Sequence, residues 1–382
     1  MRMPSVFHKQ QRLGILGGGQ LGRMLLQASA NFNFHTKVLD HQGDAPCRAL
    51  CNEFVQGSFA DFTSVMEFGK NVDVLTIEIE HVNVDALDQL QSNGIVIYPQ
   101  PEIIRTIQDK GTQKQFLRTH HLPTTDFEFV AGREDLHRFK KFFPAVQKLR
   151  KAGYDGRGVV KIGSADDLGR GFHDPSIVET HVDFEKEISV IVARNPAGEV
   201  ATFRPVEMMF HEDANLVEYL LSPASITPEV EDRSVEIARN VAVALGLVGV
   251  AAVEMFLLPD ESLLVNEIAP RPHNSGHHTI EANVTSQYEQ HLRAIFNLPL
   301  GSTAMKSPAV MVNLLGAEGY NGPVRYEGIE DVLKIEGAAI HLYDKKLTKP
   351  FRKMGHVTIL DADIRHALEK ARYVRNHVKV CA

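Results

Sequence analysis

The sequence has few cysteines and no excess of basic residues. Its 382 residues include 48 Asp and Glu against 41 Lys and Arg, which gives a formal net charge of -7. General nucleic-acid binding needs Lys and Arg in excess to neutralise phosphates, so this balance argues against a nucleic-acid partner. The three cysteines, Cys47, Cys51 and Cys381, are odd in number and lack zinc-finger spacing, which predicts reduced, structural thiols.

Long hydrophobic runs are also missing. No stretch is apolar over the roughly 20 residues that a membrane-spanning helix needs, so we expect no membrane partner. Residues 1–11 are too polar for the apolar part of a secretory signal, which predicts a cytoplasmic location. Hydrophobic residues make up 43% of the chain, which is enough for large cores, and the length predicts roughly two to three domains.

Several catalytic signatures are absent as well. The chain contains no G-x-S-x-G elbow, no H-E-x-x-H zinc motif and no Walker G-x-x-x-x-G-K-[ST] loop. His273, His277 and His278 are close enough in sequence for a zinc site, but Pro272 and Gly276 disfavour the regular helix that such a site needs. We therefore expect hydrogen-bonding roles for these histidines.

The pattern of apolar residues divides the chain into three units. In the first unit, short β runs alternate with helical stretches, which predicts a parallel sheet with helices on its faces. A helix is expected from Pro101 to about His120, and another near residues 364–375. The expected fold is α/β and α+β, with units at residues 1–100, at 101–305 with a smaller lid-bearing unit at about 124–182, and at 306–382, the last one small and β-rich.

A glycine-rich loop at residues 17–22 fits the G-x-G-x-x-G pattern of dinucleotide-binding proteins. The loop lies between a β run and a helix, and Asp40 ends the next β run, where a ribose-binding acid would lie. Taken alone, this pattern predicts NAD. Small residues at a helix N-terminus also let backbone N–H groups approach any phosphate, so a phosphorylated substrate fits equally well.

A second glycine-bearing loop, at residues 150–158, is rich in cations. Its three glycines permit close backbone approach to phosphate, and Lys148, at the end of the preceding β run, can neutralise a phosphate oxygen. The alternative is an exposed charged hairpin. The next apolar strand, at 176–182, can offer adenine a backbone edge, with Glu179 or Glu187 near the ribose hydroxyls; a plain edge strand is the alternative.

Two strand-borne carboxylates predict a metal site. Glu254 and Glu267 lie in separate β runs that can be neighbours, and Asn266 adds an amide oxygen. An all-oxygen set of this kind suits magnesium, which leaves positions free for substrate phosphates. Pro270 and Pro272 then hold the following polar residues on a rigid loop. The alternative for the two acids is a pair of solvated salt bridges.

The order of these motifs resembles that of the ATP-grasp superfamily, and within it the 5-(carboxyamino)imidazole ribonucleotide synthetases of purine biosynthesis. The resemblance covers nearly the whole chain. It is carried by residues 17–24, by Gln108-Asp109-Lys110 with Gln113-Lys114, by Lys148, residues 153–158, Glu179, Glu187, Glu254, residues 266–277, Tyr343-Asp344-Lys345 and residues 352–356.

The resemblance implies roles for individual residues. The residues implied to bind ATP are Lys110, Lys148, Gly153, Tyr154, Asp155, Gly156, Arg157, Gly158, Val159, Glu179, Thr180, His181, Val182, Glu187, His211, Asn266 and Glu267. Those implied for the substrate are Gly19, Gln20, Leu21, Glu78, Tyr154, Arg157, Arg271, His273, Asn274, Ser275 and Lys353. Arg271, His273, Asp155 and Lys353 are the implied catalytic residues, and Glu254 and Glu267 are the implied magnesium ligands.

The implied architecture is an N-terminal preATP-grasp domain, an ATP-grasp domain and a C-terminal β-rich domain, in a homodimer. The implied reaction is ATP- and bicarbonate-dependent carboxylation of 5-aminoimidazole ribonucleotide, with a transient contact to the carboxymutase of the next step left open. Three alternatives stay open: another ATP-grasp ligase of the formate-dependent glycinamide ribonucleotide transformylase type, a nicotinamide-dependent dehydrogenase, and a nucleotide-binding regulator without turnover.

Overall fold

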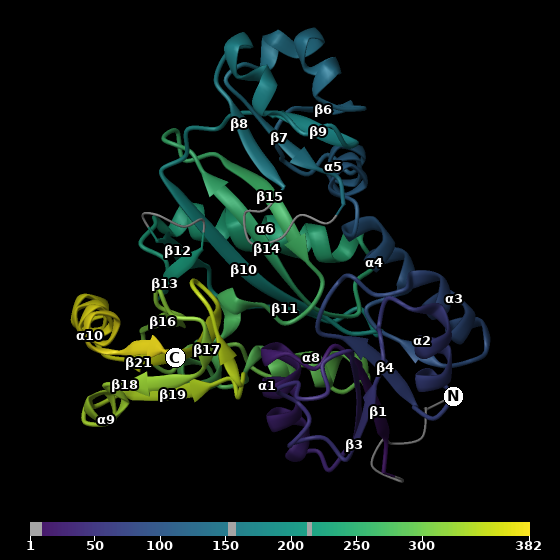
Figure 1. The fold of residues 1–382 in the computed structure, drawn as a ribbon, viewed down its shortest axis with the longest axis vertical. Coiled ribbons are helices and arrows are strands. Elements are labelled where there is room, and N and C mark those ends of the chain that lie inside the picture. Colours follow the sequence, from purple (N-terminus) through teal and green to yellow (C-terminus); the bar gives the residue numbers. More distant parts are fainter. Residues whose placement is uncertain (1–9, 152–157, 212–215) are drawn as a thin grey trace.

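The computed structural model describes residues 10–151, 158–211 and 216–382, and it arranges them around two large sheets and a smaller one (Figure 1). The N-terminal sheet has the strand order β3-β2-β1-β4-β5, and its neighbouring strands are paired in parallel. This confirms the parallel sheet expected from the alternating pattern. Its elements are β1 (Arg12–Leu16), α1 (Gln20–Ala30), β2 (His35–Asp40), β3 (Glu53–Gln56), α2 (Phe62–Gly69), β4 (Val74–Ile77), α3 (Val84–Ser92) and β5 (Val96–Ile97).

The helix expected from Pro101 to about His120 is in fact two helices. These are α4 (Pro101–Ile107) and α5 (Lys110–Thr119). Asp109 separates them because its backbone is extended and its side chain caps α5, accepting hydrogen bonds from the backbone N–H groups of Gly111 and Thr112. A capping carboxylate of this kind satisfies two of the free N–H groups at a helix start. The break turns α5 so that its lysines face the central sheet.

The lid-bearing unit is a four-stranded antiparallel sheet in the order β6-β9-β7-β8. It stands above the central sheet in Figure 1, and α5 lies beside it. Its 3-10 helices cover one face, over the apolar cluster around Leu136 and Val178. The elements are β6 (Phe127–Val130), η1 (Arg133–Phe142), β7 (Ala145–Leu149), β8 (Val159–Ile162), η2 (Ala165–Arg170) and β9 (Ser176–Thr180).

The central sheet runs across two of the expected units. Its order is β15-β14-β10-β12-β13-β16-β21-β19, with β11 paired to β10. Strands of the C-terminal unit therefore continue the ATP-grasp sheet through the β13–β16 pair rather than forming a sheet of their own. The apolar face of β16 needs a cover, and α10 supplies it. Sequence pattern alone carries no information on which edges two such units share.

The strands of this sheet are β10 (Lys186–Arg194), β11 (Val200–Thr202), β12 (Val206–Phe210), β13 (Val217–Ser222), β14 (Gly249–Leu257), β15 (Leu263–Ala269), β16 (Ala309–Leu315), β19 (Ala338–Leu342) and β21 (Lys353–Leu360). Its helices are α6 (Pro228–Ala244), η3 (Asn274–Gly276), α7 (Thr279–Ala282), α8 (Gln287–Ile295), α9 (Ile329–Val332) and α10 (Ile364–His377). The short strands β17 (Gly322–Pro323), β18 (Arg325–Glu327), β20 (Leu347–Thr348) and β22 (Lys379–Cys381) form two small ribbons. Within the described residues, no helix is both long and apolar enough to cross a membrane.

Helix α8 joins the N-terminal sheet to the central sheet. Its buried Leu292 packs in one cluster with Leu13 of β1 and Leu25 of α1. His291 on the same helix lies within 2.8 Å of the Thr76 hydroxyl of β4 and accepts a hydrogen bond from the backbone N–H of Val250 in β14. The two sheets are thus held by both apolar packing and buried hydrogen bonds.

We expect Leu292→Ala to lower the free energy of unfolding by about 2–5 kcal/mol, because it leaves a cavity where the two sheets meet. Chemical denaturation measures this change. Val243→Ala is the matched control, since 53% of the Val243 side chain is exposed on α6 and its removal should cost little. Equal destabilisation by the two variants would contradict the joining role of α8.

Candidate functional site

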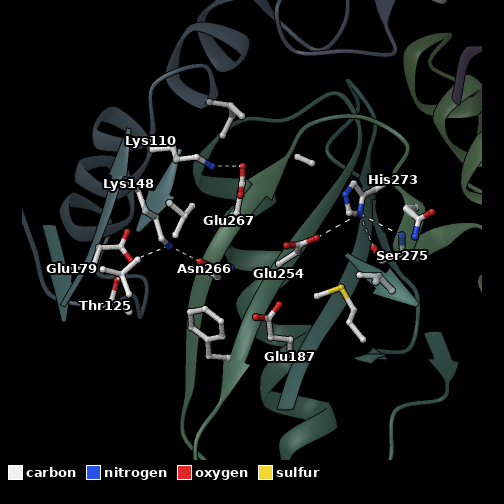
Figure 2. A pocket seen from close by; sticks show the side chains of 18 of the residues that line it. Lys110, Thr125, Lys148, Glu179, Glu187, Glu254, Asn266, Glu267, His273 and Ser275 are labelled. Carbon is white, nitrogen blue, oxygen red and sulfur yellow. Dashed lines mark hydrogen bonds and ion pairs between the residues drawn. The ribbon is translucent and has the colours of Figure 1, made fainter. Parts of the chain in front are cut away.

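A cavity of about 800 Å³ lies between the lid-bearing unit, the central sheet and the first unit (Figure 2). The implied site residues on its wall are Lys110, Lys148, Val159, Glu179, Thr180, His181, Val182, Glu187, Glu254, Asn266, Glu267, Arg271, His273, Asn274, Ser275 and Lys353. These come from five parts of the chain that are distant in sequence. Phe184 and Phe256 also line it, with ring centroids 4.6 Å apart and stacked.

Three carboxylates share one face of the central sheet. Glu187, Glu254 and Glu267 lie on the neighbouring strands β10, β14 and β15, and Glu254 and Glu267 are direct partners in the register. Burial and then the negative charges of Glu267 and Glu187 raise the pKa of Glu254 to about 8. Burial, as the largest cause, likewise raises the pKa of Glu187 to about 7. Both acids are therefore harder to ionise at this wall than they would be in water.

Two lysines neutralise part of the acidic wall. Lys110 on α5 donates a hydrogen bond of 2.7 Å to Glu267, while Lys148 on β7 donates one of 3.0 Å to Asn266. Burial opposes ionisation of Glu267, but the charge and the hydrogen bond of Lys110 outweigh it, so the pKa of Glu267 is lowered. The same Lys148 ammonium lies 3.0 Å from Glu179 of β9. The two cations thus stand between the lid and the sheet.

The loop after β15 carries the arginine and histidine expected at the site. Arg271 is ion-paired through Nε to Glu80 at 2.7 Å, and its Nη1 donates to the carbonyl oxygen of Pro272 at 3.0 Å. His273 lies at 3.0 Å from the Ser275 hydroxyl and accepts from the backbone N–H of Ser275 through Nδ1. Both side chains are therefore held in place before any substrate arrives.

The surroundings of His273 determine its charge. An imidazole in water has a pKa of ~6.5 and changes charge near neutral pH. Burial, and then the cations Arg271 and Lys353, lower its pKa well below that value. His273 is consequently a neutral imidazole at physiological pH, suited to hydrogen bonding.

Asn274 presents an amide that the protein leaves unsatisfied. The residue is buried and lines the cavity, and neither its oxygen nor its nitrogen has a hydrogen-bond partner in the part of the chain that the structure describes. Buried polar atoms are nearly always paired, and an unpaired one costs about 1–3 kcal/mol. A polar group of a bound substrate would supply the missing partner.

The N-terminal glycine loop differs from the expected phosphate site. The backbone N–H of Gly18 donates to Asp40 at 2.7 Å, and those of Gly19 and Gly22 donate to Glu78 at 3.0 Å each. Protein carboxylates therefore occupy the donors that were expected to hold a phosphate. The same contact corrects the interpretation of Asp40 as a ribose acid, since its other oxygen accepts from the backbone N–H of Gln42.

Other implied residues are not brought to the cavity wall. Gly19, Gln20, Leu21 and Glu78 are not among the described residues that line it, and His211 stands directly after β12, with its ring against Phe351. Gly158 adjoins Val159 in a left-handed conformation, with φ +74. Gly153, Tyr154, Asp155, Gly156 and Arg157 fall outside the described residues.

The structure adds Glu80, which the sequence did not indicate, and gives contacts to two lysines that had no assigned role. Glu80 pairs with Arg271, and Lys345 donates to Gln20 at 2.6 Å and to the carbonyl oxygen of Lys353. Lys114 lies one helical turn beyond Lys110. Glu80 could have been suspected because it follows a buried parallel strand, β4, whose carboxyl end faces the cavity.

Family models match three stretches of the chain. The ribonucleotide synthetase preATP-grasp domain matches residues 10–108, the ATP-grasp domain matches residues 115–288, and the phosphoribosylaminoimidazole carboxylase C-terminal domain matches residues 309–370. The N5-carboxyaminoimidazole ribonucleotide synthase of Brucella melitensis is 38% identical over 354 residues, which cover 91% of this chain and 95% of that protein.

A chloroplastic phosphoribosylaminoimidazole carboxylase from Vigna aconitifolia is 40% identical over 92% of this chain. The chain spans 64% of the length of that plant protein. Among solved structures, the N5-carboxyaminoimidazole ribonucleotide synthetase of Thermotoga maritima has 43% identity and a TM-score of 0.91, covering 98% of this chain and 100% of that one. The Aspergillus clavatus enzyme in complex with ADP and 5-aminoimidazole ribonucleotide has 32% identity and a TM-score of 0.88, covering 96% and 98% of the two chains.

These matches extend over all three units rather than over the glycine loop alone, which sets aside the dehydrogenase alternative. The chain belongs to the N5-carboxyaminoimidazole ribonucleotide synthase family, the ATP-grasp ligases of purine biosynthesis.

Proposed function

We propose that this chain carboxylates 5-aminoimidazole ribonucleotide on its exocyclic amine, using ATP and bicarbonate and releasing ADP and phosphate. The observation that carries the proposal is that the acidic wall, Lys110 of α5, Lys148 of the lid and the loop 270–275 meet at one cavity. Each half of the reaction needs one of these groups. Phosphoryl transfer needs cations, and carboxyl transfer needs an anion site beside them.

The nucleotide is proposed to lie between β9 of the lid and the central sheet. Phe184 and Phe256 give the purine an apolar wall, and the backbone of Thr180 to Val182 offers its edge hydrogen bonds. Lys148 and Lys110, which already stand between the two units, would meet the phosphates. Water is thereby excluded from the phosphates once the lid covers them.

The donor set fits magnesium. Glu254 and Glu267 face each other in the register, and burial together with the charges of Glu267 and Glu187 raises the pKa of Glu254, so a cation bound there would favour its ionised form. Two protein carboxylates are few for calcium but usual for magnesium, which shares its remaining positions with water and phosphate. When bound there, magnesium would supply charge to the phosphate oxygens at which negative charge develops.

Bicarbonate is proposed to bind Arg271. Glu80 holds one edge of this guanidinium, and its remaining N–H groups can take two oxygens of a planar anion. Bicarbonate is a poor electrophile, so ATP would first phosphorylate it to carboxyphosphate. The substrate amine then attacks that species or the carbon dioxide it releases, and neutral His273 orients the reacting oxygen by a hydrogen bond.

The phosphate of the substrate is proposed to bind the lysines near Gln20. The loop amides of Gly19 and Gly22 are engaged by Glu78, whose charge repels a phosphate. Lys353 lines the cavity, and Lys345 contacts both Gln20 and the Lys353 backbone. The homodimer, the carboxymutase contact and the cytoplasmic location stay predictions.

ADP release, assayed with each combination of substrates, tests the proposed function. We expect turnover to need magnesium and to be strongly stimulated by 5-aminoimidazole ribonucleotide together with bicarbonate. Equal turnover with formate and glycinamide ribonucleotide would favour the transformylase alternative. ATP binding without turnover in any mixture would favour a regulator.

The raised pKa of Glu254 predicts how the magnesium-free protein responds to pH. A carboxyl whose pKa rises from its ordinary 4.5 to about 8 on folding stabilises the fold below pH 4.5, and this contribution is lost as the pH rises through 8. Glu254→Gln keeps a neutral group at all pH values. Its melting temperature relative to wild type should therefore rise by roughly 2 °C or more between pH 6 and pH 8.5.

Magnesium added to the wild-type protein should reduce this difference, since the cation stabilises the ionised pair. Thermal melting with and without magnesium measures both effects. A constant difference between the two proteins across this pH range would show that Glu254 is ionised throughout and that its charge is already compensated.

Arg271→Lys should lower carboxylation by roughly a hundredfold, the scale of losing one preorganised contact to a developing charge. Lysine keeps the charge beside Glu80 but loses the bidentate fork, so nucleotide affinity and thermal stability should stay close to wild type. Arg105→Lys is the matched control, because Arg105 pairs with Asp85 and Asp88 on the surface. Carboxylation within about threefold of wild type would place the bicarbonate site elsewhere.

A further inference from the structure

Lys114 is a buried lysine at the junction between the lid and the central sheet. Only 2% of the residue is exposed, although lysine is almost never fully buried unless it is paired. Its ammonium donates to the hydroxyls of Thr124 and Thr125 at 2.7 and 2.9 Å and to the carbonyl oxygen of Val265 at 3.2 Å. All three of its donors therefore have acceptors.

These acceptors lie where the lid connection meets the central sheet. Thr124 forms a parallel bridge with Val265 of β15, and its hydroxyl donates to the same Val265 carbonyl oxygen. Thr125 follows, two residues before the first lid strand, and donates to Glu179 of β9 at 3.0 Å. Val265 immediately precedes Asn266 and Glu267. Lys114 thus contacts both the segment that leads into the lid and the strand that carries Asn266 and Glu267.

The charge of Glu179 is shared between two lysines. One of its oxygens, Oε2, receives Lys148 at 3.0 Å and Thr125. The other oxygen, Oε1, has Lys114 at 3.6 Å and no hydrogen-bond partner among the described residues. Burial opposes its ionisation, yet Lys148 and Lys114 together hold the pKa of Glu179 below its ordinary value. If either lysine is removed, the other is the nearest positive charge to Glu179.

We infer that Lys114 is a positioning residue for nucleotide binding: it neutralises Glu179 when Lys148 turns from Glu179 to the nucleotide phosphates. Without Lys114, that movement would leave a buried carboxylate with no counter-charge, a state that proteins avoid at high cost. Lys148 would then stay with Glu179. The inference rests on the proposed nucleotide position between β9 and the sheet, and it concerns a residue that need not touch the nucleotide.

The neighbouring charges are consistent with this exchange. Lys110 is engaged by Glu267, so it is not placed to replace Lys114 beside Glu179. Arg150 is engaged by Asp109 through two hydrogen bonds of 2.9 and 2.6 Å at the start of α5. Among the described residues, Lys148 and Lys114 are the cations ion-paired to Glu179.

ADP titration by calorimetry tests the inference without depending on carboxylation. Lys114→Met should weaken ADP binding by about tenfold or more, the effect of roughly 1.4 kcal/mol, while affinity for 5-aminoimidazole ribonucleotide stays within about threefold. In turnover, KM for ATP should rise more than kcat falls. Lys140→Met, on an exposed lysine of the lid, is the control and should bind ADP like wild type.

A second comparison separates positioning from support of the fold. In a Glu179→Gln background there is no charge to neutralise, so adding Lys114→Met should change ADP affinity less than about threefold. If Lys114→Met alone does not fold, this comparison decides by the same criterion, because it leaves no unpaired buried carboxylate.

Three results would overturn the inference: wild-type ADP affinity in Lys114→Met, a further tenfold loss when Lys114→Met is added to Glu179→Gln, or complete loss of ADP binding in Glu179→Gln. The last would make the Glu179 charge a direct nucleotide contact. Failure of the proposed function looks different, since the wild-type protein would then bind ADP without carboxylating 5-aminoimidazole ribonucleotide.

Discussion

Charge compensation across one cavity is the constraint on which the site depends. Three carboxylates face the cavity from neighbouring strands, and two like charges at ~4 Å repel by about 4 kcal/mol near a protein surface. Lys110 and Lys148 offset part of this repulsion, and both come from outside the sheet that carries the acids. The acidic wall therefore favours positions of α5 and the lid against the sheet, because their lysines offset its charge. A bound cation, together with the phosphates it coordinates, would offset the negative charge that the lysines leave.

Helix α5 places two lysines toward the central sheet because of its helical period. Lys110 and Lys114 are four residues apart, so both lie on one face, toward β15. Between them, the buried Gln113 accepts from and donates to the backbone of Ile268, at 3.0 and 3.5 Å. The helix is thus fixed along the strand that bears Asn266 and Glu267. A change in lid position would alter the contacts of this strand, because Thr124, at the connection to the lid, pairs with Val265 of the same strand.

Local pattern was enough to predict most elements and the polar residues at strand ends. The alternating runs gave the parallel sheet, and β15 carries Asn266 and Glu267 as expected, although it continues to Ala269. Contacts between residues far apart in the sequence could not be predicted from local pattern. Nothing near the glycine loop indicated that Glu78, 59 residues after Gly19, would occupy its amides. The break between α4 and α5 depended on a cap, and the shared C-terminal sheet depended on an edge that pattern does not specify.

His273 shows why a residue type alone does not determine its chemistry. An imidazole in water is half-protonated at pH ~6.5, a value that would suit a proton relay. In the folded chain, Arg271 lies two residues away and Lys353 arrives from β21, so a positive charge on the ring is opposed from two sides as well as by burial. The Ser275 backbone N–H directs Nδ1 as an acceptor, which leaves the proton on Nε2. Burial and the two nearby cations thus all favour the neutral form of His273, which suits the ring to hydrogen bonding.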